Sequence, residues 1–530
     1  MNKHNYIANL LLPIFIGGFS AITYLIGANL SKPIDEGNVV EFTKFNQILD
    51  LIENKYVDSV NRENLFENSI SGMLENLDPH STYIKSEDVE SANESLVGHF
   101  GGVGIRFIIL RDTLMITNVI KGGPSYKAGM KAGDRIIKVN NENIAGLKIT
   151  NQAILEKLKG PFGSNVKVTT FSPNTNKEIE LKLIRDLIAL PSLEASFMIK
   201  RSSIGYIKLN NFSNTTFKEF KSAIANLKSN GMKSLILDLR NNTGGYLDQA
   251  IKISDAFLSQ NKMIVYTEGI HEPRSDYIAK QKGDFENGKL ILLINSYSAS
   301  ASEIVSGAIQ DNDRGVIIGR RSFGKGLVQT PISLYDNSEL RLTVSRYYTP
   351  TGRCIQKPYG EKVDYRSEIL DRFESGEMQE LDSSIFNNAK KFVTPKGKTV
   401  YGGGGIFPDI YVPLDTNDLT VKVLISSSLK EYCFDYFCNN RQSLNFKTIK
   451  DFDNKFDISD QIFNNFLQSI NQKRRIRLTE NEIIKYKSRI KNYLKAEIAT
   501  YLFDVESIYY INYPFDLDIK KSIETIREKD

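Results

Sequence analysis

The chain has 530 residues, of which 41% are hydrophobic and 25% are charged, and this length predicts a multi-domain globular protein. Its formal net charge of +5 is small and no block of Lys or Arg stands out, so binding of nucleic acid is not expected. The 3 cysteines form no CxxC pair and the 4 histidines are scattered, so no disulfide framework, metal site or cofactor is expected either.

Residues 5–31 carry no formally charged side chain. A helical run of this length, at roughly 1.5 Å per residue, can cross a hydrocarbon layer of about 30 Å. A cleaved signal peptide is the alternative, although no A-x-A-like cleavage site or lipobox cysteine is present. Residues 1–31 are therefore predicted to be a membrane anchor or a signal segment, with Lys3 favouring an N-terminus inside and the rest of the chain outside the cytoplasm.

A small helical region is predicted next, over residues 35–95. Residues 41–56 and 64–77 both carry apolar side chains at helical spacing. Pro79 ends the second helix, because proline disfavours helical backbone at the residue before it. His80 is far in sequence from any candidate nucleophile and is interpreted as a structural residue.

Residues 96–185 change in character to short strands and one short helix. Strands are expected at residues 104–110, 114–119, 135–139 and 166–171, and a helix at residues 151–158. The stretch AGMKAGDRIIKVNN makes this region resemble a PDZ domain. The resemblance implies that a glycine-rich turn binds the terminal carboxylate of a peptide, which then joins the sheet edge as an extra strand. The residues implicated are Gly101, Gly102, Val103, Gly104 and Ile105.

Strand and helix patterns alternate over residues 186–413, which predicts an α/β layered domain. Strands are expected at residues 204–209 and 234–239, and helices at residues 215–227 and 246–258. The second strand runs into a turn with Gly244 and Gly245, whose spacing fits neither phosphate-binding glycine pattern. Backbone donors for an oxyanion are a better use of this turn.

A second strand-to-helix turn, at residues 295–302, is rich in serine. It lies between an apolar run at residues 290–294 and a helical pattern that begins near Ile304. A serine held in such a turn exposes its hydroxyl group, and backbone N–H groups beside it can stabilise an anion.

A serine nucleophile needs a base, and without a plausible histidine the remaining strong candidate is a lysine. Lys325 lies between two glycines and has no acidic neighbour in the sequence. Its pKa would have to fall from about 10.4, through burial or the lack of an anionic partner. If this segment is extended, Gln329 points to the same face and its neutral amide can orient the amine. An exposed loop lysine is the alternative interpretation.

Residues 414–530 are predicted to be a helical extension. Thr479 and Glu482 fit a capping box, and apolar residues at helical spacing follow as far as Tyr501. The expected role is packing, either against the core or against a second subunit in a homo-oligomer.

The motifs LDLRNNTGGYL, SASASEI, FGKGLVQ, LRLTVSRYYTP and GGGIFPD occur in unbroken order and, with the PDZ-like segment, the resemblance covers residues 40–413. In this the chain resembles the C-terminal processing peptidases, or tail-specific proteases, of serine peptidase family S41. The resemblance implies a crotonase- or ClpP-like α/β protease core. It also implies a serine endopeptidase that takes proteins with exposed C-termini as substrates, in the bacterial cell envelope. The insertion at residues 360–398 and the tail after residue 413 depart from the common core of the family.

Position by position, the resemblance makes Ser300 the nucleophile, Lys325 the general base and Gln329 its orienting partner. It places the oxyanion hole at the backbone N–H of Ala301 and that of Gly244 or Gly245. Two alternatives remain. An inactive PDZ-bearing scaffold at the membrane would have no need of all three catalytic side chains. An HtrA-like Ser-His-Asp protease would need clustered histidines and a G-x-S-x-G turn, which the sequence lacks.

Overall fold

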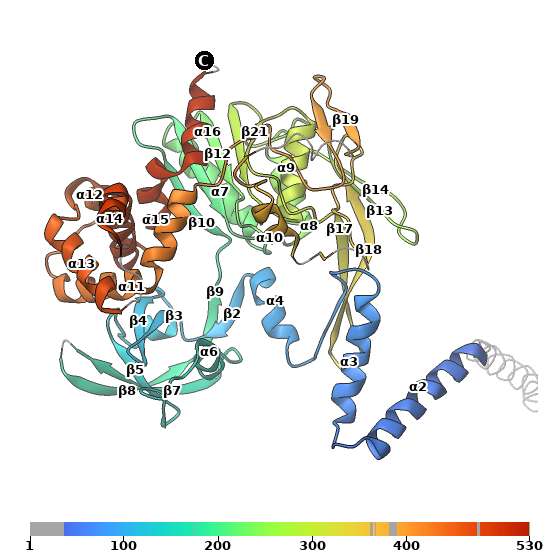
Figure 1. Cartoon of the computed structure of the whole chain (residues 1–530), viewed down its shortest axis with the longest axis horizontal. Helices are drawn as coiled ribbons and strands as arrows, with labels where there is room; N and C mark the ends of the chain where they lie inside the picture. The colour runs from blue at the N-terminus through green and yellow to red at the C-terminus, as the bar shows by residue number, and fades with distance from the viewer. Residues whose placement is uncertain are drawn as a thin grey trace, which may run out of the picture. The chain divides into compact units, whose positions relative to one another are not determined.

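The computed structural model describes residues 36–173, 175–360, 364–365, 367–380, 389–473 and 478–528 (Figure 1). The predicted anchor or signal segment at residues 1–31 lies outside this part of the chain. Within these ranges, no helix is both long enough and apolar enough to span a membrane. The chain divides into two compact units, Met1–Leu77 and Asp78–Asp530.

The small unit contains two helices, α2 (Glu36–Lys55) and α3 (Arg62–Glu75), as the periodicity predicted. The rings of Phe45 and Phe66 meet edge to face with centroids 6.1 Å apart. The side chain of Asn61 accepts a hydrogen bond from the amide of Asn64 and so caps the start of α3.

The PDZ-like region of the large unit is built on an antiparallel sheet with the order β3-β4-β5-β7-β8. The strands are β3 (Ile105–Leu110), β4 (Thr113–Val119), β5 (Arg135–Val139), β7 (Asn165–Ser172) and β8 (Lys177–Ile184), with β6 (Glu142–Asn143) beside β5. Helices α5 (Pro124–Lys127) and α6 (Asn151–Leu158) accompany them. Strand β3 ends the order, so one of its edges is unpaired in this sheet and suits the addition of a peptide strand.

Two short strands outside that sheet lie where the PDZ-like region begins and ends. Strand β2 (His99–Gly102) pairs antiparallel with β9 (Asp186–Ala189). Gly101 has to be a glycine here, because a Cβ atom would lie 2.1 Å from the carbonyl oxygen of Gly160. Helix α4 (Val89–Val97) leads into this pair of strands.

The α/β core is organised around a six-stranded sheet with the order β10-β11-β12-β15-β16-β21. Its strands are β10 (Leu193–Met198), β11 (Ile204–Leu209), β12 (Ser234–Asp238), β15 (Lys289–Ile294), β16 (Val316–Gly319) and β21 (Ile410–Tyr411). All neighbours are parallel except β10 with β11. The central strands are apolar on both faces, as parallel strands covered on both sides require.

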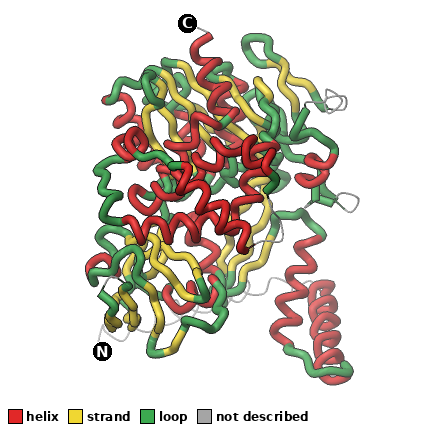
Figure 2. Tube along the Cα trace, turned by 60° about the vertical axis from the view of Figure 1, so that its left-hand side comes forward, coloured by secondary structure: helices red, strands yellow, loops and turns green. Residues whose placement is uncertain are grey.

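Helices cover both faces of this sheet (Figure 2). On β12, Leu235 and Leu237 pack with α7 (Thr216–Ser229), α8 (Leu247–Asp255) and α9 (Ala301–Asp311). Ile236 points the other way, into a cluster with α15 (Glu506–Asn512) and α16 (Leu517–Glu528) of the C-terminal extension. The extension therefore packs against the core and covers its second face.

The rest of the extension is helical, as predicted. It comprises α11 (Thr416–Asn440), α12 (Ile449–Lys455), α13 (Asp460–Lys473), α14 (Glu480–Phe503) and the short η2 (Tyr513–Phe515). The predicted capping box is confirmed, because the amide of Thr479 donates to Glu482 Oε2 at 2.8 Å and the amide of Glu482 donates back at 3.3 Å. The extension also contacts the PDZ-like sheet, where Arg111 pairs with Glu431 at 3.3 Å.

A second sheet of the core has the order β1-β18-β13-β14, with β17 also paired to β18. It contains β1 (Thr82–Ile84), β13 (Met263–Glu268), β14 (Ser275–Ile278), β17 (Leu327–Ser333) and β18 (Glu339–Tyr348). The sequence predicted only helix up to residue 95, whereas β1 pairs with β18 and belongs to the large unit. A strand of three residues is too short to show a period in the sequence. Helix α10 (Glu368–Glu374) and strand β19 (Lys391–Val393) lie in the expected insertion, and β20 (Thr399–Tyr401), directly after it, pairs with β19.

Candidate active site

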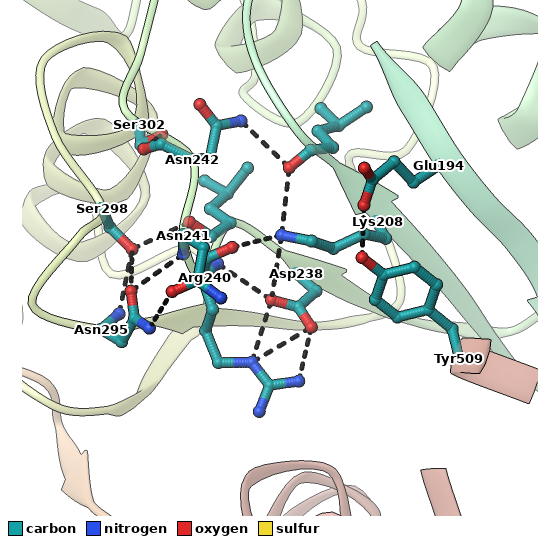
Figure 3. Close-up of polar contacts among 12 residues, drawn as sticks. Glu194, Lys208, Asp238, Arg240, Asn241, Asn242, Asn295, Ser298, Ser302 and Tyr509 are labelled. Atoms are coloured by element: carbon teal, nitrogen blue, oxygen red, sulfur yellow. Dashed lines mark hydrogen bonds and ion pairs between the residues drawn. The ribbon is translucent and has the colours of Figure 1, made fainter. Parts of the chain in front are cut away.

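The two glycine- and serine-rich turns meet at one edge of the central sheet. They follow β12 and β15, which are adjacent parallel strands, so both turns leave the sheet at its carboxyl edge. The carbonyl of Asn242 in the first turn accepts hydrogen bonds from the amide of Ala299 at 3.0 Å and from the hydroxyl of Ser302 at 2.8 Å. The Ser298 hydroxyl donates to the carbonyl of Leu239 at 2.8 Å (Figure 3). The serines on either side of Ser300 therefore bind the turns together.

Ser300 itself is held in strained backbone at the start of α9. Its φ of 55° and ψ of −114° are values that residues other than glycine rarely adopt. Its amide donates to Glu303 Oε2 at 2.8 Å. The residue is partly exposed, while the next residue, Ala301, is fully buried. The turn thus presents one hydroxyl group at its surface, as a nucleophile requires.

The glycine turn packs directly on Ser300. A Cβ atom at Gly244 would lie 2.7 Å from the Cβ of Ser300, and one at Gly245 would lie 2.2 Å from the carbonyl oxygen of Phe212. Both positions therefore need glycine, since backbone or the serine itself occupies the space beside them.

The backbone amides of this turn differ in what they bind. The amide of Gly244 donates to Asn242 Oδ1 at 2.9 Å. The amides of Gly245 and Ala301 donate no hydrogen bond to any other described residue. Of the two glycines left open by the sequence, Gly245 has the amide that can bind a new acceptor.

Lys325 and Gln329 contact each other, as the sequence predicted. Lys325 Nζ donates to Gln329 Oε1 at 2.9 Å, across a β-bulge between Val328 and Gln329 in β17. Burial lowers the pKa of Lys325, against the opposing effect of the Asp78 and Glu303 carboxylates. Across the described residues, no hydrogen bond joins Lys325 Nζ to the hydroxyl of Ser300.

A fully buried carboxylate, Glu303, joins the serine turn to the lysine segment. Besides the amide of Ser300, it accepts from the amides of Gly324 at 2.7 Å and Lys325 at 2.9 Å, and from the hydroxyl of Ser322 at 2.5 Å. Burial raises the pKa of Glu303 to about 7, although these hydrogen bonds favour the charged form. The sequence analysis missed this residue. Its signal was an acidic side chain three residues after a candidate N-cap serine.

His80 is a second residue that the sequence analysis did not place at the site. Its Nε2 lies 2.7 Å from the hydroxyl of Tyr365, and its ring centroid is 6.5 Å from that of Phe323. Burial and then the charge of Lys325 lower the pKa of His80 to about 4, so its ring is neutral at pH 7. It lies beside the lysine segment as a neutral, partly buried group.

A cluster of charged residues joins the C-terminal extension to the residues that lead into the glycine turn. Arg240, which follows β12, binds Asp518 at 2.7 Å and Asp516 at 2.9 Å, and also binds Asp238 at 2.6 Å. Buried Lys208 of β11 donates to the carbonyl of Arg240 (Figure 3). These residues line a cavity of about 440 Å³ between the sheet and the extension. The cluster fixes the backbone from which the glycine turn starts.

The structure divides the predicted carboxylate-binding residues between two elements. Gly101 and Gly102 lie in β2 and pair with β9, while Val103 and Gly104 precede the unpaired edge of β3. The amides of Val103 and Gly104 make no hydrogen bond to another residue of the described chain, and Gly104 has a φ of 75°. These two amides are free to bind a carboxylate, next to Ile105. Within the described ranges, no group of three or more His, Cys, Asp or Glu residues could hold a metal ion.

The chain matches known families along most of its length. Residues 203–366 match the family model described as peptidase family S41, and residues 115–170 match that of the PDZ domain. Residues 27–88 match the N-terminal domain of the activating protease CtpB, and residues 420–504 match a family of unknown function, DUF8443.

Curated bacterial proteins resemble most of the chain. The carboxy-terminal-processing protease of Bartonella bacilliformis is 37% identical over 349 residues, which cover 64% of this chain and 79% of that protein. The carboxy-terminal processing protease CtpA of Bacillus subtilis is 33% identical over 358 residues, which cover 66% and 75%. The solved photosystem II D1 C-terminal processing protease is 26% identical, with a TM-score of 0.34 and coverage of 59% of this chain and 89% of that one. This chain is a serine-type protease with a PDZ domain and belongs to peptidase family S41, the family of the carboxy-terminal processing proteases.

Proposed function

We propose that this protease is an endopeptidase in which Ser300 is the nucleophile and Lys325 the general base, and that its PDZ domain recognises protein C-termini. One observation carries the catalytic part. The carboxylate of Glu303 binds the backbone on both sides of the site, at Ser300 and at Lys325. The lysine it holds is partly buried, and the hydrogen-bond partner of its amine is the neutral amide of Gln329.

The first half of the reaction would form an acyl-enzyme. Neutral Lys325 takes the proton of the Ser300 hydroxyl as its oxygen attacks the scissile carbonyl carbon. The amides of Ala301 and Gly245 stabilise the negative charge that develops on the carbonyl oxygen. The ammonium of Lys325 then gives its proton to the leaving amine, and the peptide bond breaks.

The second half would release the N-terminal product. Lys325, neutral again, takes a proton from a water molecule that attacks the ester on Ser300, and its ammonium then gives this proton to the Ser300 oxygen as the ester bond breaks. Gln329 holds the amine throughout by accepting one of its N–H groups. The missing hydrogen bond between Lys325 and Ser300 fits a site that closes when substrate binds, since catalytic hydrogen bonds often tighten only then.

The recognition part of the proposal rests on the PDZ domain. The unpaired edge of β3 and the free amides of Val103 and Gly104 suit a peptide strand that ends in a carboxylate. This geometry supports peptide substrates with exposed C-termini. An inactive scaffold is less favoured, because the chain retains the serine, the lysine and the amide that catalysis needs.

Two broader features belong to the same proposal. The mostly parallel sheet with helices on both faces is compatible with a crotonase- or ClpP-like core. The bacterial CtpA-like relatives favour a cell-envelope or secreted protein. Residues 1–31 would serve as anchor or signal, with the catalytic part outside the cytoplasm. Assembly into a homo-oligomer stays a prediction.

Cleavage of a protein with an apolar, unstructured C-terminus tests the proposal. The full chain should cleave this substrate, and Ser300→Ala should not. Amidating the terminal carboxylate should lower kcat/KM about tenfold, the order of one lost charge-assisted interaction. A protein with the same apolar stretch ahead of a folded C-terminal domain is the control.

The two parts of the proposal can fail separately. Equal cleavage by the Ser300→Ala variant would contradict the assignment of the nucleophile. Equal kcat/KM on the amidated and the free substrate would contradict recognition of the C-terminus, and would leave the catalytic assignment standing.

A further inference from the structure

A buried carboxylate lies behind the lysine–glutamine pair. Asp78 lies four residues before Thr82, the first residue of β1, and is 7% exposed. It accepts hydrogen bonds from the amide of His80 at 2.8 Å and from the amide and hydroxyl of Ser81 at 3.0 and 2.6 Å. A fourth donor is the hydroxyl of Thr343 on β18, at 3.1 Å. The short segment before β1 therefore brings a charged group to the strands that carry the base.

Thr343 connects this carboxylate to Gln329. The two residues are register partners on β18 and β17. Gln329 Nε2 donates to the hydroxyl oxygen of Thr343 at 3.4 Å, and Gln329 Oε1 accepts from Lys325 Nζ at 2.9 Å. A continuous series of contacts thus runs from Asp78 through Thr343 and Gln329 to Lys325.

The chemistry of these groups allows the hydrogen bonds of this series to be donated in only one direction. A carboxylate can only accept, so the single hydroxyl proton of Thr343 points to Asp78. The oxygen of Thr343 then faces Gln329 with lone pairs and selects the NH₂ side of its amide. The carbonyl side of Gln329 is left for the amine of Lys325.

We propose that Asp78 and Thr343 are positioning residues of this protease, which fix the amide of Gln329 with its oxygen toward Lys325 and so aim the amine at Ser300. The inference rests on the proposed Ser–Lys mechanism. Neither residue touches the reacting atoms. A Gln329 amide turned the other way would donate an N–H group to the lone pair of the neutral amine, and so occupy the position that must accept the serine proton.

The charges around the amine add a second consequence. The pKa of Asp78 lies below its ordinary value because the hydrogen bonds of Ser81, His80 and Thr343 outweigh its burial, so the carboxylate is charged at neutral pH. Lys325 is surrounded by Asp78 and Glu303, which raise its pKa, and by Arg341, which lowers it, while burial lowers it most. His80 is neutral and lies close enough for the charge of Lys325 to lower its pKa. Removal of the charge at Asp78 should therefore lower the pKa of Lys325.

The first test replaces the hydroxyl group of Thr343. Thr343→Val keeps the shape but loses the bridge, and kcat should fall about 10- to 100-fold with KM unchanged, the range typical of residues that support a reactive group from behind. Thr343→Ser keeps the hydroxyl and should restore kcat to within about 3-fold. The exposed Thr330 on β17 supplies the matched control, Thr330→Val. Rates are expressed per active site titrated with a serine-directed inhibitor, so loss of folded enzyme does not enter kcat.

The second test uses the pH dependence of Asp78→Asn. A lysine base works when neutral, so kcat/KM rises with pH through the pKa of Lys325. Without the negative charge at residue 78 this rise should shift to lower pH, while kcat at the plateau falls. A residue that only stabilised the fold would lower the titrated fraction and leave the profile where it was.

The outcomes separate the inference from the mechanism beneath it. Full activity of Ser300→Ala or Lys325→Ala would overturn the proposed mechanism, and the inference with it. If those variants are inactive while Thr343→Val keeps wild-type kcat and Asp78→Asn keeps the wild-type pH profile, the inference alone is wrong. Equal loss in Thr343→Ser and Thr343→Val would also contradict it, because the hydroxyl group would then have no special part.

Discussion

Replacing Lys325 with alanine should lower kcat on the tail substrate by about 10⁴-fold, the upper range for loss of a general base, with little change in KM. The reason is that Lys325 is the basic group held next to the serine turn by Glu303, and the nearby His80 has a pKa of about 4. Steady-state rates with the full chain measure the effect. The exposed Lys121 supplies the control, Lys121→Ala.

Lys325→Arg distinguishes a base from a mere positive charge. A guanidinium group stays protonated at working pH and cannot take the serine proton, so this variant should be as inactive as the alanine variant.

The pH dependence of kcat/KM tests the same assignment. Burial lowers the pKa of Lys325, so kcat/KM should rise with pH, and the midpoint of this rise should lie below the pKa of an ordinary lysine. An active arginine variant, or activity that falls as Lys325 loses its proton, would contradict the account.

Replacing Glu303 with glutamine should have the second-largest effect. Four donors converge on this carboxylate, and a glutamine turns one acceptor oxygen into a donor. Unsatisfied buried donors cost about 1–3 kcal/mol each, so the free energy of unfolding should fall by about 2–5 kcal/mol. The serine turn and the lysine segment also lose their common anchor, and a misplacement of about 1 Å can lower a rate 10²-fold.

Denaturant unfolding and active-site-normalised kcat measure the two effects of Glu303→Gln. The exposed Glu272 supplies the control, Glu272→Gln.

The pH dependence of folding stability provides a further check on Glu303. Because the pKa of Glu303 is raised to about 7, the folded state holds its proton more tightly than the unfolded chain. Its contribution to stability is therefore present at low pH and is lost as pH rises toward 7. A Glu303→Gln variant with unchanged kcat and the same pH dependence of stability would contradict this role.

Local patterns predicted a good part of the molecule. The expected bounds of β5, α6 and β11 agree with the structure, because turn or cap residues bound each of these short runs. The contact between Lys325 and Gln329 was also expected if the segment were extended, although Lys325 precedes β17 and a β-bulge interrupts the strand before Gln329. Such features depend on residues within a few positions of each other.

The residues that the sequence analysis missed are those that depend on long-range contacts. Asp78 and Thr343 are 265 residues apart, and the strand that brings them together has only three residues. Glu303 is near Ser300 in sequence, but its bonds to the lysine segment exist only once β17 is in place. The extension likewise covers the second face of the central sheet through apolar residues whose partners no local pattern identifies.

The central claim is that Ser300 is the nucleophile and that Lys325 activates it. The most direct measurement treats the full chain with a serine-directed fluorophosphonate and maps the adduct by mass spectrometry among the 5 serines between residues 296 and 306. The account predicts a single adduct on Ser300, and strongly slowed labelling in Lys325→Ala. An adduct on Ser298 or Ser302, or labelling at an unchanged rate without Lys325, would contradict it.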